Sequence, residues 1–460
     1  MTSCPRIVIA GTQSGVGKTS VTLALVAALR RRGFRVQTFK VGPDFLDPSY
    51  LALASGRPCY NLDGWMTGKD YVHRLFARTT NDADIAVVEG VMGLFDGADP
   101  ATLEGSTAEI ARWLRAPVIL IASAHGMGRS LAAVVKGYAD FEPEVKVAGV
   151  IANQCGSERH AAWLSDSLRV SSLPPLVGAI PRNAFPELEG RHLGLVTAHS
   201  GNLSGVVLDA FANIFDLHGS VDDLFELAQG LPSLETPPPE RPTPSKPIRI
   251  GIAFDAAFHF YYQDLFDEME LRGCELIRFS PMENNSLPER LDVLYIGGGY
   301  PEEHAEALSA NLPMLTEIRQ FAASGRPVYA ECGGLIYLSR SLETLDGKQY
   351  PLAGLLPANT RMLNRKKSLG YVEVTLKEDS LWGVQGATWR GHEFHYSELT
   401  EDPTVNPDWK TIYRARRPLS GIAADEGFQS GRVLASYIHL HLASRPEAVE
   451  RFITRCGGTS

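Results

Sequence analysis

Apolar runs and helical patterns alternate along the first half of the chain. Short runs rich in β-branched residues predict strands over residues 6–10, 35–41, 84–89, 116–122, 145–153 and 176–180. Apolar positions at helical spacing predict helices from residue 18 onward and over 108–114, 131–139, 158–168 and 203–214. This alternation predicts an α/β domain with a parallel sheet and helices on both of its faces.

A dense group of prolines interrupts this pattern. Residues 231–247 read LPSLETPPPERPTPSKP, a composition that supports neither a helix nor strand pairing and stiffens a connection. Beyond it, apolar runs again predict strands, over 247–254, 276–280, 292–296, 326–332 and 432–442. We therefore expect a first α/β domain over residues 1–230, a linker over 231–247 and a second α/β domain over 248–460.

The first predicted strand runs into a glycine-rich loop and then a helix. This order forms a phosphate cradle, because loop N–H groups and the positive end of the helix face the same anion. Lys18 would reach the β- and γ-phosphates of ATP, and the Thr19 hydroxyl would bind Mg²⁺. A standard phosphate loop has a glycine in place of Thr12, so an ordinary glycine-rich turn is the alternative. We expect the ATP contacts to come from Gly11, Thr12, Gln13, Ser14, Gly15, Val16, Gly17, Lys18, Thr19 and Ser20.

Carboxylates follow two of the other predicted strands. Asp44 and Asp47 lie in the loop after residues 35–41, and Glu89 ends the run over 84–89. The carboxyl ends of parallel strands are where open α/β sheets bind ligands. We therefore predict Glu89 as a second Mg²⁺ contact and Asp44 as a metal or substrate residue, with a turn of two solvated acids as the alternative for the loop.

A cysteine follows a strand in the second half. The run RPVYAEC ends at Cys332, and glycines and an apolar segment come next, as in a nucleophile elbow. A helix N-terminus at this point is expected to lower the pKa of the thiol. Backbone N–H groups of Gly298, Gly299 and Gly333 are candidates for an oxyanion hole.

A cysteine nucleophile needs a base, and two histidines lie late in the chain. His439 and His441 belong to the run RVLASYIHLHL, where strand alternation would place both on one side. A lone histidine in such a strand is more often structural, but beside an elbow cysteine we predict His439 as the base. No acidic third member is evident from spacing. The remaining cysteines are predicted to be buried or incidental: Cys4, Cys59, Cys155, Cys274 and Cys456.

The composition narrows the class of protein. The chain has 460 residues, of which 44% are hydrophobic and 21% charged, and its net charge is −9. The acidic balance gives no support to nucleic acid or an anionic membrane as partner. Scattered cysteines suggest neither a zinc site nor a disulfide framework, and the N-terminal residues lack the regions of a signal peptide. A cytoplasmic enzyme is the expectation.

Four motifs in the second half resemble the class I glutamine amidotransferase domain, in the divergent form found in cobalamin biosynthesis. They are LYIGGGYPE (294–302), YAECGGLIYL (329–338), GHEFHYSEL (391–399) and ASYIHLHL (435–442). The first half resembles the ATP-binding domain of dethiobiotin-synthetase type. Its motifs are GTQSGVGKT (11–19), KVGPDFLDP (40–48) and VVEGVMGLFDG (87–97). Together the motifs resemble the cobyrinic acid a,c-diamide synthase family over nearly the whole chain.

The resemblance implies a two-part reaction. Glutamine would be hydrolysed at Cys332 through a thioester with the help of His439. ATP, with Mg²⁺, would phosphorylate an acetate carboxylate of a corrin-type macrocycle, and ammonia would displace the phosphate, once each at side chains a and c. Residues of the loop after the second strand would contact the substrate: Asp44, Phe45, Leu46 and Asp47.

One position departs from the family pattern. Many class I glutaminase domains carry His-x-Glu, but His441 stands where this glutamate is expected, so the orientation of His439 has no evident source.

Three questions stay open at this stage. Close relatives amidate hydrogenobyrinic acid or nickel-sirohydrochlorin. A P-loop switch ATPase with a non-catalytic second domain is a remoter alternative, disfavoured by the Cys332–His439 pair and by Gln13, where such ATPases usually carry a lysine. The oligomeric state is not fixed, and a homodimer remains open.

Overall fold

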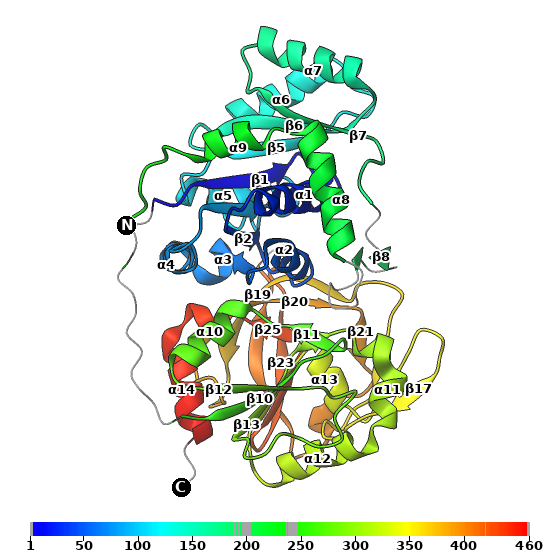
Figure 1. Ribbon diagram of the computed structural model, residues 1–460. Coiled ribbons are helices and arrows are strands. Elements are labelled where there is room, and N and C mark those ends of the chain that lie inside the picture. The colour runs from blue at the N-terminus through cyan, green and yellow to red at the C-terminus, as the bar shows by residue number, and fades with distance from the viewer. Residues whose placement is uncertain are drawn as a thin grey trace. The chain divides into compact units, whose positions relative to one another are not determined.

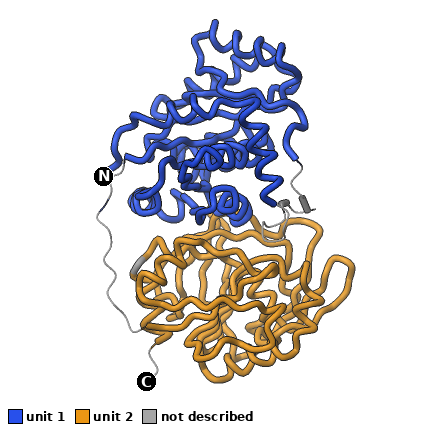
Figure 2. Tube along the Cα trace, in the orientation of Figure 1, with its two compact units in different colours: residues 1–239 blue, residues 240–460 orange. Residues whose placement is uncertain are grey.

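The computed structural model divides the chain into two compact units, residues 1–239 and 240–460 (Figures 1 and 2). It describes residues 3–186, 190–191, 194–195, 204–235, 237, 247–418 and 420–457. Most of the proline-rich stretch 231–247 lies outside the described residues, so the limits of the expected linker remain a prediction. The two units are described separately below.

Unit 1 is built on a seven-stranded sheet with the order β3-β2-β4-β1-β5-β6-β7, in which every pairing is parallel. The strands are β1 (Arg6–Gly11), β2 (Val36–Val41), β3 (Tyr60–Leu62), β4 (Ile85–Glu89), β5 (Val118–Ser123), β6 (Val147–Cys155) and β7 (Leu176–Pro181). A short pair, β8 (Gly190–Arg191) and β9 (Gly194–Leu195), stands apart from this sheet. The predicted parallel α/β architecture is confirmed.

Helices cover both faces of this sheet. As a result, the side chains of β1 are buried on either face. Ile7 and Ile9 belong to the apolar cluster beneath helix α1, whereas Val8 and Ala10 point to the opposite face and are equally inaccessible. The helices are α1 (Lys18–Arg31), α2 (Asp47–Ser55), α3 (Gly64–Thr67), α4 (Lys69–Thr79), α5 (Thr107–Trp113), α6 (Ser130–Phe141), α7 (Glu158–Val170), α8 (Gly205–His218) and α9 (Val221–Ala228).

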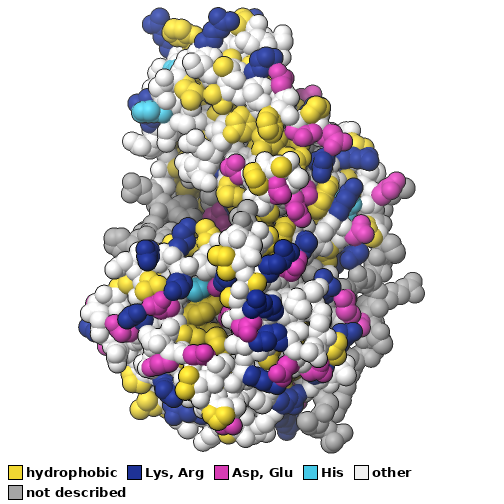
Figure 3. All heavy atoms as spheres, turned by 180° about the vertical axis from the view of Figure 1, so that it is seen from behind, with side chains coloured by type: hydrophobic (Ala, Val, Ile, Leu, Met, Phe, Trp, Pro, Cys, Tyr) yellow, Lys and Arg dark blue, Asp and Glu magenta, His cyan; other side chains and the backbone are white. Residues whose placement is uncertain are grey.

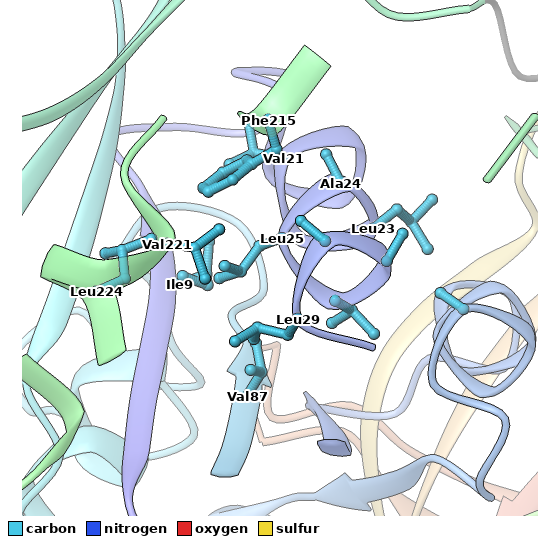
Figure 4. Close-up of a cluster of buried hydrophobic side chains, with 14 of the residues drawn as sticks. Ile9, Val21, Leu23, Ala24, Leu25, Leu29, Val87, Phe215, Val221 and Leu224 are labelled. Atoms are coloured by element: carbon cyan, nitrogen blue, oxygen red, sulfur yellow. The ribbon is translucent and has the colours of Figure 1, made fainter. Parts of the chain in front are cut away.

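Helix α1 is the centre of the core of unit 1. Its apolar side chains pack between the sheet and helices α8 and α9, as Figure 4 shows for Leu25 and Leu29, which lie toward Ile9 and Val87. A helix buried on several sides needs few polar positions, and α1 is apolar from Val21 to Leu29 apart from Thr22. This packing fixes the start of α1, and with it the glycine-rich loop.

Several elements of unit 1 were not predicted. These are β3, β8, β9, α2, α3, α4 and α9. The most important is α2, because it begins at Asp47 and places this carboxylate in the first turn of a helix, not in a loop. Pro48 in the first turn and a left-handed Gly56 after the last residue are ordinary start and stop signals for this helix.

Unit 2 contains a ten-stranded mixed sheet with the order β12-β10-β13-β15-β24-β23-β22-β19-β20-β25. Its first half is parallel: β10 (Arg249–Ala253), β12 (Glu275–Phe279), β13 (Val293–Ile296), β15 (Val328–Glu331) and β24 (Val433–Ser436). Its second half is antiparallel: β19 (Ser368–Leu376), β20 (Thr388–His395), β22 (Lys410–Arg416), β23 (Ala423–Ser430) and β25 (Ile438–Leu440). The second α/β domain is confirmed, but its antiparallel half was not predicted.

The predicted single strand over 432–442 is wrong. It divides at Tyr437 into β24, which pairs with β15, and β25, which pairs with β20. The buried carboxylate of Glu426 accepts hydrogen bonds from the Ser436 hydroxyl at 2.6 Å and from the Tyr437 N–H at 2.8 Å. These bonds give the Ser436 hydroxyl and the Tyr437 N–H a partner at the point where the strand is interrupted.

Smaller elements complete unit 2. Its helical segments are α10 (Gln263–Leu271), η2 (Pro301–His304), α11 (Ala305–Ala310), α12 (Leu312–Ala323), α13 (Gly333–Leu338), η3 (Pro403–Val405), η4 (Leu442–Ser444) and α14 (Pro446–Gly457). Its remaining strands are β11 (Phe258–Phe260), β14 (Gly298–Gly299), β16 (Ser341–Glu343), β17 (Gln349–Pro351), β18 (Thr360–Met362) and β21 (Ser397–Leu399).

Two surface properties concern the expected partners. On the face drawn in Figure 3, Lys and Arg side chains are interspersed with Asp and Glu side chains. Within the part of the chain that the structure describes, no helix has the length and apolar character needed to cross a bilayer.

Candidate active sites of the two units

The ten residues predicted to contact ATP run without a break from Gly11, the last residue of β1, through the phosphate loop to Ser20 in the first turn of α1. Gly15 and Gly17 adopt φ values of 75° and 96°, which favour glycine. A Cβ atom on Gly17 would also collide with the side-chain amide of Asn153, which donates to the Val16 carbonyl at 2.9 Å. Asn153, at the end of β6, therefore supports the loop from a distant part of the sequence.

Lys18 is buried within this loop. Its Nζ atom donates to the carbonyl oxygens of Gln13 at 3.2 Å and Met92 at 2.5 Å. Burial, together with the nearby charge of Lys40, lowers the pKa of Lys18. The negative charge of an anion bound in the loop would favour the charged form of Lys18 and so oppose this lowering of its pKa. The position of Lys18 therefore suits a phosphate ligand.

A second lysine, which the sequence analysis did not select, lies among the predicted acids. The Nζ atom of Lys40 is 2.6 Å from Asp47, 2.9 Å from Glu89 and 4.0 Å from Asp44. We call these four residues the lysine–acid cluster. Burial disfavours the charge of Lys40, but the three carboxylates outweigh it and raise its pKa. The sequence did contain a signal for Lys40. This lysine lies near the end of an apolar strand, just before Asp44 and Asp47, where open α/β sheets bind ligands.

The cluster also contains oxygen donors suited to Mg²⁺. The Thr19 hydroxyl donates to Glu89 Oε1 at 2.8 Å and lies 3.4 Å from Asp47 Oδ2. The other carboxylate oxygen of Glu89 is buried and has no hydrogen-bond partner among the described residues. In the same described ranges, no group of three or more His, Cys, Asp and Glu side chains could hold a metal. This donor set fits Mg²⁺, which usually keeps few protein ligands besides phosphate oxygens and water.

The predicted acids differ in their surroundings. Burial, opposed by Lys40, raises the pKa of Glu89 to about 7. Burial and the charge of Asp47 raise the pKa of Asp44 to about 6. For Asp47, the attraction of Lys40 outweighs burial and lowers the pKa. The structure thus brings Asp47 and Glu89 to the Thr19 hydroxyl.

Asp44 has a local structural role as well. Its Oδ1 atom accepts from the backbone N–H groups of Leu46 at 2.8 Å and Asp47 at 3.1 Å, so it orders the turn that precedes α2. Phe45 and Leu46, the other predicted substrate residues, are half-buried in this turn. Their contact with a substrate stays a prediction.

In unit 2, Cys332 occupies a strained turn between β15 and α13. Its φ and ψ values are 48° and −99°, a conformation that side chains other than glycine rarely adopt. The Cys332 N–H donates to the Ser436 carbonyl at 2.7 Å. A Cβ atom on Gly334 would collide with the Ile296 carbonyl, so the glycine lets the helix start close to β13. The predicted nucleophile elbow is the observed geometry.

The expectation of a lowered thiol pKa is wrong. Burial, followed by the charge of Glu302, raises the pKa of Cys332, and the N–H of Gly333 opposes this only in part. Helix α13 has six residues, so its N-terminus offers little compensation. The thiol is therefore protonated at rest and needs a base.

The three glycines predicted for the oxyanion hole lie together. Gly298 and Gly299 form β14, which pairs with β11, and Gly299 has a φ of 156°. A Cβ atom on Gly333 would lie 3.0 Å from the Gly299 nitrogen. The Gly297 N–H, by contrast, donates to the Tyr261 hydroxyl at 2.8 Å. This arrangement places Gly298 and Gly299 beside Gly333, which directly follows Cys332.

The two predicted histidines have different neighbours. A Cβ atom on Gly298 would lie 2.5 Å from Cε1 and 3.2 Å from Nε2 of His439, so this ring adjoins the oxyanion glycines. His441 instead lies 3.5 Å from Asp264, and its ring centroid is 4.5 Å from that of Tyr262. Of the two, His439 is the one placed beside the elbow. The other five cysteines are buried free thiols, as predicted.

Each half of the chain matches a known protein family. A family model described as a CobQ/CobB/MinD/ParA nucleotide binding domain matches residues 7–196, and one described as a CobB/CobQ-like glutamine amidotransferase domain matches residues 249–447. A solved glutamine amidotransferase covers 46% of this chain and 99% of its own, with 18% identity and a TM-score of 0.33, at which the likeness carries no functional argument.

Curated relatives match over the full length. The cobyrinate a,c-diamide synthase of Syntrophotalea carbinolica is 54% identical and is covered completely, as is this chain. The enzyme of the same name from Leptospira interrogans is 42% identical over 98% of each chain. That of Priestia megaterium is 39% identical over 98% of this chain and 97% of its own. The chain belongs to the cobyrinate a,c-diamide synthase family.

Proposed function

We propose that this protein amidates the a and c acetate side chains of cobyrinic acid, with glutamine as the nitrogen source and ATP as the energy source. The observation that carries the proposal is the presence in one chain of two sites. Unit 1 has a phosphate loop beside a lysine–acid cluster, and unit 2 has a strained cysteine beside a histidine and three glycines. A switch ATPase would need only the first of these sites.

In unit 2, His439 would take the proton of the Cys332 thiol, and the sulfur would attack the carboxamide carbon of glutamine. Backbone N–H groups of Gly299 and Gly333 would stabilise the oxyanion of the tetrahedral intermediate. His439 would then donate the proton to the leaving nitrogen, which departs as ammonia and leaves a thioester. Water, activated by the same histidine, would hydrolyse the thioester to glutamate.

In unit 1, a carboxylate oxygen of the macrocycle would attack the γ-phosphorus of ATP, and ADP would leave. Lys18 and Lys40 would stabilise the charge that develops on the transferred phosphoryl group. Thr19 and Glu89 would hold Mg²⁺, which would supply positive charge to offset that of the phosphate groups. Ammonia would attack the carbonyl carbon of the acyl phosphate, so that phosphate leaves and an amide remains.

The same chemistry fits close alternatives that differ in the macrocycle. Hydrogenobyrinic acid and nickel-sirohydrochlorin carry equivalent carboxylates, and we favour cobyrinic acid because the relatives described above bear its name. The six free thiols suit a reducing compartment, so we also propose a cytoplasmic location.

The test is to incubate the protein with ATP, Mg²⁺, glutamine and each of the three macrocycles separately. Mass spectrometry should detect two successive acid-to-amide changes on cobyrinic acid and slower or no change on the others. Faster diamidation of another macrocycle would reassign the substrate. ATP turnover without amidation of any macrocycle would instead favour the switch ATPase.

A further inference from the structure

A buried carboxylate lies beside the nucleophile, and the mechanism above does not use it. Glu331 ends strand β15, immediately before Cys332, and is 2% exposed. Its Oε2 atom accepts from the Tyr295 hydroxyl at 2.8 Å, and its Oε1 atom accepts from the Tyr329 hydroxyl at 2.5 Å and from the Leu440 N–H at 3.3 Å. A carboxylate held by three donors at the centre of a sheet has a fixed position.

This carboxylate faces the candidate base. Glu331 Oε2 lies 3.7 Å from Nδ1 of His439, and the bond from Leu440 ties Glu331 to the residue that follows the histidine. The opposite edge of the ring, with Cε1 and Nε2, adjoins Gly298. The histidine thus has an acid on one nitrogen and the oxyanion glycines on the other side, which is the arrangement of a catalytic base with its orienting acid.

Other polar groups near His439 are not suited to orient its ring, because they have other partners or carry no negative charge. His392 stacks on His439 with ring centroids 4.9 Å apart, but burial and the charges of His439 and His441 lower its pKa, so it is neutral. Asp264 pairs with His441 at 3.5 Å.

A second acid of the same region is also engaged elsewhere. Glu393 pairs with His395 at 3.0 Å and with Arg417 at 2.5 Å. Among the described residues, Glu331 is the carboxylate for which the structure gives an ion pair with His439.

We propose that Glu331 is the positioning residue of the glutaminase site and takes the role that a glutamate two residues after the histidine has in related enzymes. When His439 accepts the thiol proton, its positive charge forms beside the Glu331 carboxylate, whose Oε2 atom lies 3.7 Å from Nδ1. The carboxylate fixes the orientation of the ring and stabilises the imidazolium. Nucleophile and orienting acid are therefore neighbours in the sequence. This inference rests on the proposed glutamine hydrolysis at Cys332.

The test compares Glu331→Gln with two further variants. Glu331→Asp restores the charge, and Glu268→Gln is a matched control, because that buried glutamate of helix α10 pairs with Arg272, the residue after the helix. We expect Glu331→Gln to lower kcat with glutamine by at least about 100-fold and to leave KM within about two-fold. Glu331→Asp should recover part of kcat. Amidation with ammonium should stay at the wild-type rate in all three.

A second readout does not depend on turnover. In NMR spectra of the resting full-length protein, Glu331→Gln should change the ¹⁵N chemical shift of His439 Nδ1, because the carboxylate 3.7 Å from this nitrogen loses its charge. Tyr295→Phe should change the same chemical shift in the opposite direction, because the carboxylate loses a hydrogen-bond donor and leaves more negative charge facing the ring. Opposite shifts from two neighbouring substitutions are not expected of a purely structural role.

The failures can be told apart. An unchanged kcat in Glu331→Gln, or an unchanged chemical shift of His439 Nδ1 in both variants, would overturn the role of Glu331 alone. If the wild-type protein does not hydrolyse glutamine, the proposed function fails, and the NMR spectra of His439 still decide whether the two side chains are coupled. If Glu331→Gln does not fold, Tyr295→Phe carries the test by the direction of its shift.

Discussion

The two sites bury ionisable groups in opposite ways. In unit 1, a buried cation, Lys40, lies among three carboxylates, which keep it charged. In unit 2, burial and nearby carboxylates, Glu302 first among them, raise the pKa of the Cys332 thiol. The first site therefore keeps a cation charged beside the phosphate loop, whereas the second stays inactive until a base removes a proton. This difference suits a protein that should not release ammonia without a use for it.

Removal of the nucleophile should separate the two sites most sharply. Cys332→Ala is expected to lower glutamine-dependent amidation by at least about 10³-fold, because no thioester can form. Amidation with ammonium should continue at close to the wild-type rate. Product formation from each nitrogen source, measured by mass spectrometry, checks this. Cys274→Ala, at another buried thiol of unit 2, is the control, and equal loss with both nitrogen sources would contradict independent sites.

Loss of the buried cation should have the converse effect. Lys40→Met leaves buried carboxylates unpaired and removes charge from the phosphoryl-transfer site, so we expect about a 10²- to 10³-fold lower rate with either nitrogen source. Hydrolysis of glutamine alone should be unaffected. Lys136→Met, at an exposed lysine paired with Asp140, serves as control. Normal amidation by Lys40→Met would show that the lysine–acid cluster is only structural.

The buried carboxyl group of Glu426 should make the free energy of unfolding depend on pH. Burial raises the pKa of Glu426 to about 7, so the folded protein binds this proton more tightly than the unfolded chain. The stabilisation is present below pH about 4.5 and is lost as the pH rises through about 7, by about 3 kcal/mol at most. Urea unfolding at pH 5 and pH 8 should therefore show a smaller loss of stability in Glu426→Gln than in the wild type. Parallel losses would contradict this prediction.

The smallest effect is expected within the phosphate loop. Gly15→Ala and Gly17→Ala both place a side chain at positive φ, at a cost of about 1–2 kcal/mol each. Only Gly17→Ala also displaces the Asn153 amide, whereas nothing lies within 4 Å of a Cβ atom on Gly15. We expect KM for ATP to rise further in Gly17→Ala, by about a factor of five to ten, as the loss of one hydrogen bond implies. Equal KM values would argue against a supporting role for Asn153.

The sequence predicted best what is contiguous. The phosphate loop, the elbow at Cys332 and the glycines at 298 and 299 are each short contiguous stretches of sequence. Local spacing was therefore enough to predict them. Asn153 reaches the phosphate loop and Lys40 reaches Glu89, each from a different strand, and no spacing rule predicts these contacts.

The failures have the same physical origin. The strand break at Tyr437 depends on Glu426, and the pKa of Cys332 depends on burial and on Glu302, neither of which is local. The family pattern places an acid two residues after the histidine, but the structure gives His439 an ion pair with Glu331, more than a hundred residues earlier. The antiparallel half of the second sheet follows from long-range pairing that a pattern of alternation does not specify.

The central claim is that nitrogen released from glutamine at Cys332 enters the macrocycle at the ATP site. The most direct measurement supplies glutamine labelled with ¹⁵N at its amide, together with ATP, cobyrinic acid and unlabelled ammonium at a concentration below that needed for ammonium-dependent amidation. The account predicts a diamide that carries ¹⁵N at both new amides. A diamide without the label, formed while labelled glutamine is hydrolysed, would contradict it.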